Sequence, residues 1–219
     1  MDTEVLRQAP LFSALDDEAA GALRDAGAQL LQIDEPFLAG YPEQIELAVE
    51  AINIVTRDVD VSWALHVCYG NRYARPLWEG HYDFLFPAVL DARVDTLVLE
   101  FARKGDEDLP VIARSGWDRA IGLGVVDVKS RTVETPEVVE ARIRHALEFV
   151  PAERLVINPD CGLRNLPTAV ATAKLRAMVD LVDPGLVVAE DAGFSAAVAA
   201  VAGGRPVLGD VPGGVSLGG

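Results

Sequence analysis

The feature that most constrains this chain is the alternation of short apolar runs with longer amphipathic stretches. The runs are rich in aliphatic and β-branched residues, and they lie at 30–33, 61–67, 96–99, 120–126 and 155–157. Each run is continuous rather than alternating between apolar and polar residues, which is typical of strands buried on both faces of a parallel sheet. We therefore expect these five segments to be parallel strands.

The amphipathic stretches between the runs predict helices at 42–55, 82–92, 136–149 and 168–181. Thr135 followed by Pro136 places a capping residue before a proline at the first helical position, which is a common helix start. Repeated strand–helix units predict an α/β fold with right-handed connections. Two architectures satisfy this order, a (β/α) barrel of the TIM type and an open doubly wound sheet.

The two ends of the chain depart from this central pattern. The 219 residues suffice for one large domain with terminal segments, and half of them are hydrophobic, which is enough for a sizeable core. We expect an N-terminal helical segment at 1–29 and a βα domain at 30–182. A C-terminal extension at 183–219 is expected to hold a short strand near 186–189, a helix and a Gly-rich tail.

Composition disfavours several classes of partner. The formal net charge is −15, and a surface of this kind repels nucleic-acid phosphates and anionic lipids. No apolar run is long enough to span a bilayer, and the acidic start lacks the features of a signal peptide. We expect a cytoplasmic protein without nucleic-acid or membrane partners. In that compartment Cys68 and Cys161 are expected to be buried thiols or metal ligands rather than a disulfide.

Polar residues gather at or just after the C-terminal ends of the predicted strands. They are Asp34, Glu35, His66, Cys68, Glu100, Asp127, Lys129, Asp160 and Cys161. In a (β/α) barrel these strand ends converge on one face, where the active site lies. The sequence therefore predicts that residues far apart in the chain meet at one edge of the sheet.

Four of these residues have the chemistry of metal ligands. His66 and Cys68 are two positions apart, so their side chains point to the same face of a strand. Cys161 could supply a second sulfur and Glu100 an oxygen. Zinc favours thiolate sulfur and imidazole nitrogen, and it accepts a carboxylate as a further ligand. The pattern is compatible with a zinc site.

Plainer interpretations of the same residues remain open at this point. The histidine and the two cysteines could simply be packed in the core, where cysteine is among the most often buried residues. Glu100 could form an ion pair with Arg103 or Lys104, and Asp34 could cap the following helix. Spacing alone does not separate these interpretations from a metal site.

Five segments of the chain resemble the C-terminal barrel of cobalamin-independent methionine synthases, especially their short relatives. Their order and spacing match over roughly two-thirds of the chain, and they are LQIDEP (31–36), HVCYGN (66–71), DTLVLEFAR (95–103), GVVDVKS (124–130) and NPDCGL (158–163). The resemblance implies a TIM-barrel-like parallel sheet. It also implies that His66, Cys68, Glu100 and Cys161 are zinc ligands.

The resemblance further implies an activity. A zinc-dependent S-methyltransferase would move a methyl group from a 5-methyltetrahydrofolate-type donor to the thiol of homocysteine, as in methionine synthesis. Asp34 would contact the amino group of the amino acid, and Glu35 and Asp127 lie at the same edge as further candidate substrate-binding residues. The cation would lower the pKa of the substrate thiol, so that the thiolate forms at neutral pH.

Two departures from the family pattern leave alternatives open. Lys129 stands where full-length synthases have a histidine that is assigned a proton-donating role, which makes Lys129 a candidate catalytic residue. The first strands of the family barrel have no counterpart here, so the barrel is expected to be incomplete unless terminal segments or a second copy of the chain complete it. Alternatives are therefore a zinc–thiolate transferase with another thiol or a methyl-corrinoid donor, and a non-catalytic zinc-binding remnant or partner-dependent subunit.

Overall fold

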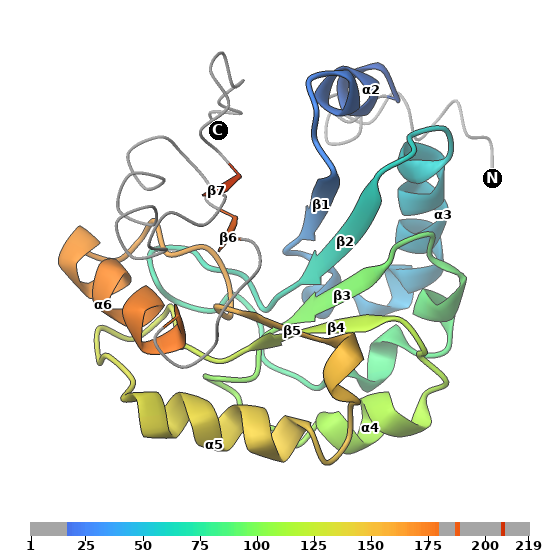
Figure 1. Cartoon of the computed structure of the whole chain (residues 1–219). Helices are drawn as coiled ribbons and strands as arrows, with labels where there is room; N and C mark the ends of the chain where they lie inside the picture. The colour runs from blue at the N-terminus through green and yellow to red at the C-terminus, as the bar shows by residue number, and fades with distance from the viewer. Residues whose placement is uncertain (1–16, 180–186, 189–206, 209–219) are drawn as a thin grey trace.

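The computed structural model describes residues 17–179, 187–188 and 207–208, and its largest element is a parallel sheet (Figure 1). All five predicted strands are confirmed, and the sheet order follows the chain order. The strands are β1 (Leu30–Glu35), β2 (Ser62–Val67), β3 (Thr96–Leu99), β4 (Ala120–Gly124) and β5 (Leu155–Asn158). A separate parallel pair consists of β6 (Val187–Val188), inside the predicted strand at 186–189, and β7 (Val207–Leu208).

Helices precede, connect and follow the five strands of the sheet. The α-helices are α2 (Asp17–Asp25), α3 (Ile45–Thr56), α4 (Leu109–Arg114), α5 (Pro136–Ala146) and α6 (Thr168–Val179). Short 3-10 helices are η1 (Leu38–Gly40), η2 (Pro42–Gln44), η3 (Tyr82–Leu85), η4 (Ala88–Asp91) and η5 (Ala152–Arg154). Three of the four predicted helices are thus confirmed. The ends of α3 and α5 differ from the prediction, whereas α6 begins at Thr168 as predicted and residues 180–181 lie outside the described residues. Helix α4 was not predicted, and the helix expected after 186–189 also lies outside the described residues.

The predicted helix at 82–92 is wrong, because the segment forms two 3-10 helices, η3 and η4, instead of one α-helix. They are separated at Phe86 and Pro87, where Phe86 is extended with ψ 141°. Proline offers no backbone N–H and disfavours helical geometry in the residue before it. An apolar spacing of helical type therefore could not continue through Pro87.

The strand order decides between the two architectures left open by the sequence. A doubly wound sheet reverses its order at a switch point, whereas here each strand pairs with the next one along the chain. Helices α3 to α6 follow one another around the outside of the curved sheet (Figure 1). The fold is therefore barrel-like. Within the described residues, β1 and β5 remain edge strands and the barrel is not closed.

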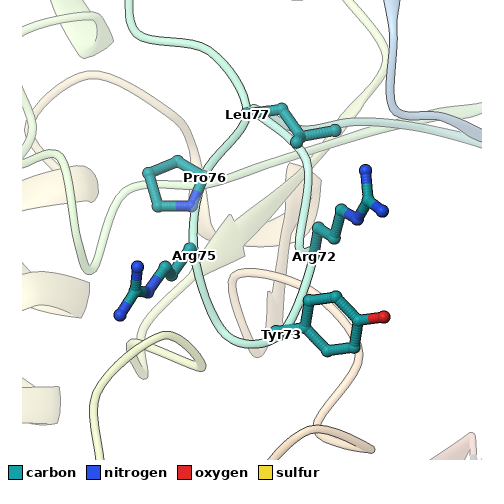
Figure 2. A pocket seen from close by; sticks show the side chains of 5 residues that line it. All are labelled: Arg72, Tyr73, Arg75, Pro76 and Leu77. Atoms are coloured by element: carbon teal, nitrogen blue, oxygen red, sulfur yellow. The ribbon is translucent and has the colours of Figure 1, made fainter.

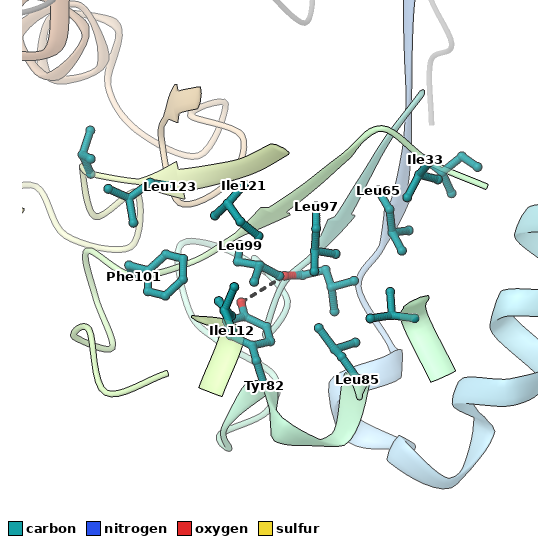
Figure 3. Close-up of a cluster of buried hydrophobic side chains, with 14 of the residues drawn as sticks. Ile33, Leu65, Tyr82, Leu85, Leu97, Leu99, Phe101, Ile112, Ile121 and Leu123 are labelled. Carbon is teal, nitrogen blue, oxygen red and sulfur yellow. Dashed lines mark hydrogen bonds between the residues drawn. The ribbon is translucent and has the colours of Figure 1, made fainter. Parts of the chain in front are cut away.

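The two faces of the sheet differ in side-chain size. The face toward the helices carries large aliphatic side chains that pack with residues such as Leu85 and Ile112 (Figure 3). They are Ile33, Leu65, Val67, Leu97, Leu99, Ile121 and Leu123. The opposite face carries His66, Val98 and Gly122 on one rung of the ladder. Large residues thus form the hydrophobic core between the sheet and the helices, and small or polar residues line the opposite face of the sheet.

Burial on both faces holds only for the central strands. Nearly every residue of β2, β3 and β4 is buried, whereas β1 and β5 are largely half-buried or exposed. Val156 of β5, for example, is 46% exposed. No helix within 17–179 has the length and hydropathy that a bilayer span requires.

Candidate functional site

Three residues meet at the C-terminal edge of the sheet, and we call them the thiol–imidazole cluster. His66 and Cys68 come from the end of β2, and Cys161 comes from the loop after β5. One ligand atom from each residue lies within 4.8 Å of the corresponding atoms of the other two, so the three could hold one metal ion. The curvature of the sheet brings together residues that two intervening strands separate in the ladder.

The imidazole of His66 is oriented by the neighbouring strand. Its Nδ1 lies 3.2 Å from the carbonyl oxygen of Val98, an acceptor, so Nδ1 carries the proton and donates it. The other nitrogen, Nε2, is buried and has no hydrogen-bond partner among the described residues. A backbone carbonyl that fixes the tautomer in this way is the usual arrangement behind a metal-binding histidine.

The pKa values of the two cysteine thiols are shifted in opposite directions. Interaction with the Cys68 thiol, supported by His66 and opposed by burial, lowers the pKa of Cys161 to about 4. Interaction with Cys161, together with burial, raises the pKa of the Cys68 thiol. Although burial opposes its charged form, His66 has a raised pKa because Cys161 lies beside it. The lowered pKa of Cys161 favours its thiolate, the form of cysteine that binds metal ions.

Glu100 lies beside the cluster but is bound to other groups. The Nζ atom of Lys129 lies 2.5 Å from its Oε1, and the backbone N–H of Tyr69 donates to the same oxygen at 3.3 Å. Arg103 Nε lies 3.8 Å from Oε2, as the ion-pair interpretation expected, although the main partner is Lys129. Burial raises the pKa of Glu100, while the charge of Lys129 opposes this shift. A metal-ligand role for Glu100 stays a prediction.

The candidate substrate-binding residues have different surroundings. Asp34 is exposed and pairs in the ladder with His66, and its side chain accepts a hydrogen bond from Gln32 at 2.8 Å. Glu35 instead accepts backbone N–H groups of the following turn at 2.9 and 2.5 Å, and burial raises its pKa. Asp127 accepts the backbone N–H of Lys129 at 2.8 Å. Asp34 thus has the freest carboxylate of the three.

The carboxylate of Asp160 fastens the Cys161 loop to the end of β3. It accepts the consecutive backbone N–H groups of Phe101, Ala102 and Arg103 at 2.9, 2.8 and 2.8 Å. Burial and the charge of Glu100 raise the pKa of this carboxyl to about 7, against the effect of the three N–H groups. We call this arrangement the Asp160 anchor. It positions Cys161, a role the sequence did not reveal.

Gly124 makes room for the Asp160 anchor. A Cβ atom on Gly124 would overlap the Asp160 carboxylate, and it would lie 2.9 Å from the Leu99 carbonyl oxygen. The absence of a side chain at the end of β4 is therefore a condition for the anchor. The sequence shows the glycine, but it does not indicate that the residue 36 positions later packs against it.

A buried ion pair supports the loop that carries Lys129. Lys174 is fully buried in α6, and its Nζ lies 2.7 Å from Oε2 of Glu134. The other oxygen of Glu134 accepts the backbone N–H of Asp127 at 2.8 Å. The sequence contained a signal for this pair, because Lys174 shares the apolar face of its helix with Ala171, Leu175 and Met178, which are also buried.

A pocket of about 410 Å³ lies in the loop after β2 (Figure 2). It is lined by Arg72, Tyr73, Arg75, Pro76 and Leu77. The two guanidinium groups point in different directions in Figure 2, so they do not converge on one anion. Asn71 links this loop to the Cys161 loop by donating to the Gly162 carbonyl at 2.8 Å. The pocket borders the site without sharing its ligands.

Comparison with known proteins identifies relatives of the chain. Residues 4–183 match the family model described as the cobalamin-independent synthase catalytic domain. A methionine synthase of Thermococcus kodakarensis is 40% identical over 157 residues, which are 72% of this chain and 44% of that protein. A methionine synthase of Saccharolobus islandicus is 37% identical over 170 residues, which are 78% of this chain and 48% of that protein.

A solved structure shows the same fold. It is a B12-independent methionine synthase from Shewanella sp. W3-18-1 in complex with selenomethionine, and it matches with a TM-score of 0.69 at 24% identity. The match covers 78% of this chain and 52% of that one. The present chain spans about half the length of the curated relatives it matches. With its family model matched over most of its residues, the chain belongs to the cobalamin-independent methionine synthase catalytic domain family.

Proposed function

We propose that this chain is the zinc-dependent S-methyltransferase domain of a methionine synthase, with residues 30–182 as its catalytic unit. The observation that carries the proposal is the thiol–imidazole cluster, in which two sulfurs and a ring nitrogen of His66 lie within 4.8 Å of one another. Nε2 of His66 has no hydrogen-bond partner among the described residues. A packed core cysteine or histidine would not require this convergence.

The donor set of the cluster fits zinc. Zinc prefers thiolate sulfur and imidazole nitrogen in a tetrahedral site, and catalytic sites keep a fourth position that a substrate can take. His66, Cys68 and Cys161 would supply three ligands, and Glu100 is the carboxylate beside them. Hard cations such as magnesium prefer all-oxygen sites, so they are disfavoured by this set.

The surrounding residues would bind and orient an amino-acid thiol. Asp34 is exposed and next to His66 in the ladder, so its carboxylate could bind the ammonium group of homocysteine while the sulfur points to the cluster. Glu35 and Asp127 lie at the same edge and would line the rest of the site. Zinc, when bound, would lower the pKa of the substrate thiol and place its sulfur.

The transfer balances without a further reagent. A carbon–sulfur bond forms at the methyl group, and the bond between that carbon and the donor nitrogen breaks. The thiol loses a proton and the nitrogen of a 5-methyltetrahydrofolate-type donor gains one. Lys129, at the place of the family's proton-donating histidine, is the candidate donor, because its buried Nζ atom lies at the same edge of the sheet.

Zinc X-ray absorption before and after addition of homocysteine tests this proposal. A new sulfur in the zinc shell, together with formation of methionine from a methyl-folate donor, is the expected result. An unchanged shell that contains both cysteines would indicate a structural zinc and would overturn the catalytic assignment. Coenzyme M as acceptor and methylcobalamin as donor are the comparison arms, since activity only with these would assign the chemistry to another thiol or donor.

Closure of the sheet by a second copy of the chain stays a prediction.

A further inference from the structure

The Lys129–Glu100 pair is a buried ion pair beside the thiol–imidazole cluster. The side chain of Lys129 is 3% exposed and that of Glu100 is fully buried, with 2.5 Å between Nζ and Oε1. Glu100 Oε2 has no hydrogen-bond partner among the described residues, and the carboxylate is not part of the three-residue cluster. Lys129 thus holds one oxygen, while Arg103 Nε approaches the other only to 3.8 Å and makes no hydrogen bond to it.

The position of Lys129 is fixed by its own supports. The carboxylate of Asp127 accepts the backbone N–H of Lys129 at 2.8 Å, and the backbone N–H of Asp127 is in turn bound by Glu134 at 2.8 Å. Glu134 is paired with the fully buried Lys174. This series of contacts reaches from α6 to the loop after β4. The fold therefore fixes the position of the Lys129 ammonium group beside Glu100, whereas a lysine on the surface would be free to move.

We propose that Lys129 is a positioning residue that holds the Glu100 carboxylate outside the thiol–imidazole cluster and releases it when the carboxylate becomes a metal ligand. The inference rests on the proposed zinc-dependent function. A buried carboxylate without a close cation is strongly disfavoured, and Arg103 stays at 3.8 Å without a hydrogen bond, so Glu100 needs either the lysine or the metal as its close partner. With both cations close by, a small movement exchanges one for the other. Lys129 would then decide how readily a substrate thiol takes the fourth position.

Zinc affinity in a double-mutant cycle tests this inference without any activity measurement. Lys129→Met removes the competitor, so we expect zinc to bind about tenfold more tightly in chelator competition. In the Glu100→Gln background the same substitution should change the affinity by no more than about twofold. Simple repulsion between the ammonium and the metal would act in both backgrounds. An equal gain in both therefore overturns the inference.

Three further proteins complete the design. Lys129→Arg keeps the cation and should restore an affinity close to that of the wild type, and Lys129→Gln replaces Lys129→Met if the latter does not fold. Lys104→Met is the matched control, since Lys104 contacts the Gly80 carbonyl and the Tyr69 ring instead of Glu100. Its zinc affinity should not change.

The outcomes separate this inference from the proposed function. Zinc that binds through both cysteines but gives additive effects in the cycle overturns the role of Lys129 and leaves the zinc-dependent function standing. A protein that does not bind zinc through the cysteines overturns both.

Discussion

Asp160 and Cys161 are neighbours in the chain, yet their side chains enter two buried polar regions that are built in different ways. In the Asp160 anchor, the carboxylate oxygens are bound by three consecutive backbone N–H groups. In the thiol–imidazole cluster next to it, Nε2 of His66 has no hydrogen-bond partner among the described residues. The first region is satisfied within the protein, and the second is not.

This difference distinguishes a region that stabilises the fold from a region that could bind a ligand. Leaving a buried polar atom unpaired costs stability, so such an atom needs an explanation. In the anchor, every contact joins the Cys161 loop to the end of β3, and removing one side breaks the fold locally. In the cluster, one ligand atom from each residue lies within 4.8 Å of the other two, and we expect these side chains to contribute little to the stability of the metal-free chain. We expect mutations in the two regions to affect different measurements.

Asp160→Ala should give the largest effect on the free energy of unfolding of the metal-free protein. Three buried N–H groups would lose their acceptor, with an expected cost of at least about 3 kcal/mol. Chemical denaturation measures this loss. Asp106→Ala is the matched control, because Asp106 is a largely exposed partner of His145. A loss for Asp160→Ala no greater than that of the control would break the distinction between the regions.

Gly124→Ala should have the next largest effect, because its Cβ would overlap the Asp160 carboxylate. Overpacking of this kind costs about 1–3 kcal/mol. Gly21→Ala is the control, since nothing lies within 4 Å of its added Cβ. Gly21 lies inside α2, where alanine is favoured over glycine, so the control should be stabilised by about 0.5–1 kcal/mol. Equal stability changes in the two variants would argue against the anchor.

Cys68→Ser and Cys161→Ser should change stability least and metal content most. In the metal-free protein each is expected to alter the free energy of unfolding by only about 1 kcal/mol, because no cross-link is lost. Bound zinc, measured by elemental analysis after purification, should fall well below one equivalent in both. Full zinc content in either variant would remove that cysteine from the ligand set.

The sequence predicted the part of the site that depends on strand ends. His66 lies near the end of one strand, Cys68 directly follows that strand, and Cys161 follows another parallel strand, so the fold rules alone bring them to one edge. The partner of Glu100 was not predicted, because Lys129 lies 29 positions away and only the packed loop brings the two together. The Asp160 anchor was missed for the same reason, since backbone N–H groups leave no trace in a residue pattern.

The errors in the predicted fold also have local causes. The apolar spacing of 82–92 indicated a helix, but Pro87 breaks the backbone hydrogen bonding that the spacing alone does not reveal. The continuous apolar runs predicted strands buried on both faces, which β1 and β5 contradict because each has only one neighbour in the described sheet. Periodicity reports which residues avoid water, and it does not report how many strands flank them.

The hydroxyl group of Tyr82 links the fold to the geometry of the site. It donates to the Val67 carbonyl at 3.0 Å and accepts the Glu100 N–H at 3.0 Å, so one oxygen atom connects β2 and the residue after β3 at the end of the shared ladder. The separation between the strand that carries His66 and the residue that carries a candidate carboxylate ligand is thereby set from inside the hydrophobic core. If the cluster binds a metal ion as proposed, discrimination between ions of different radius, such as zinc and cadmium, would then depend on a phenol that is fully buried in the hydrophobic core.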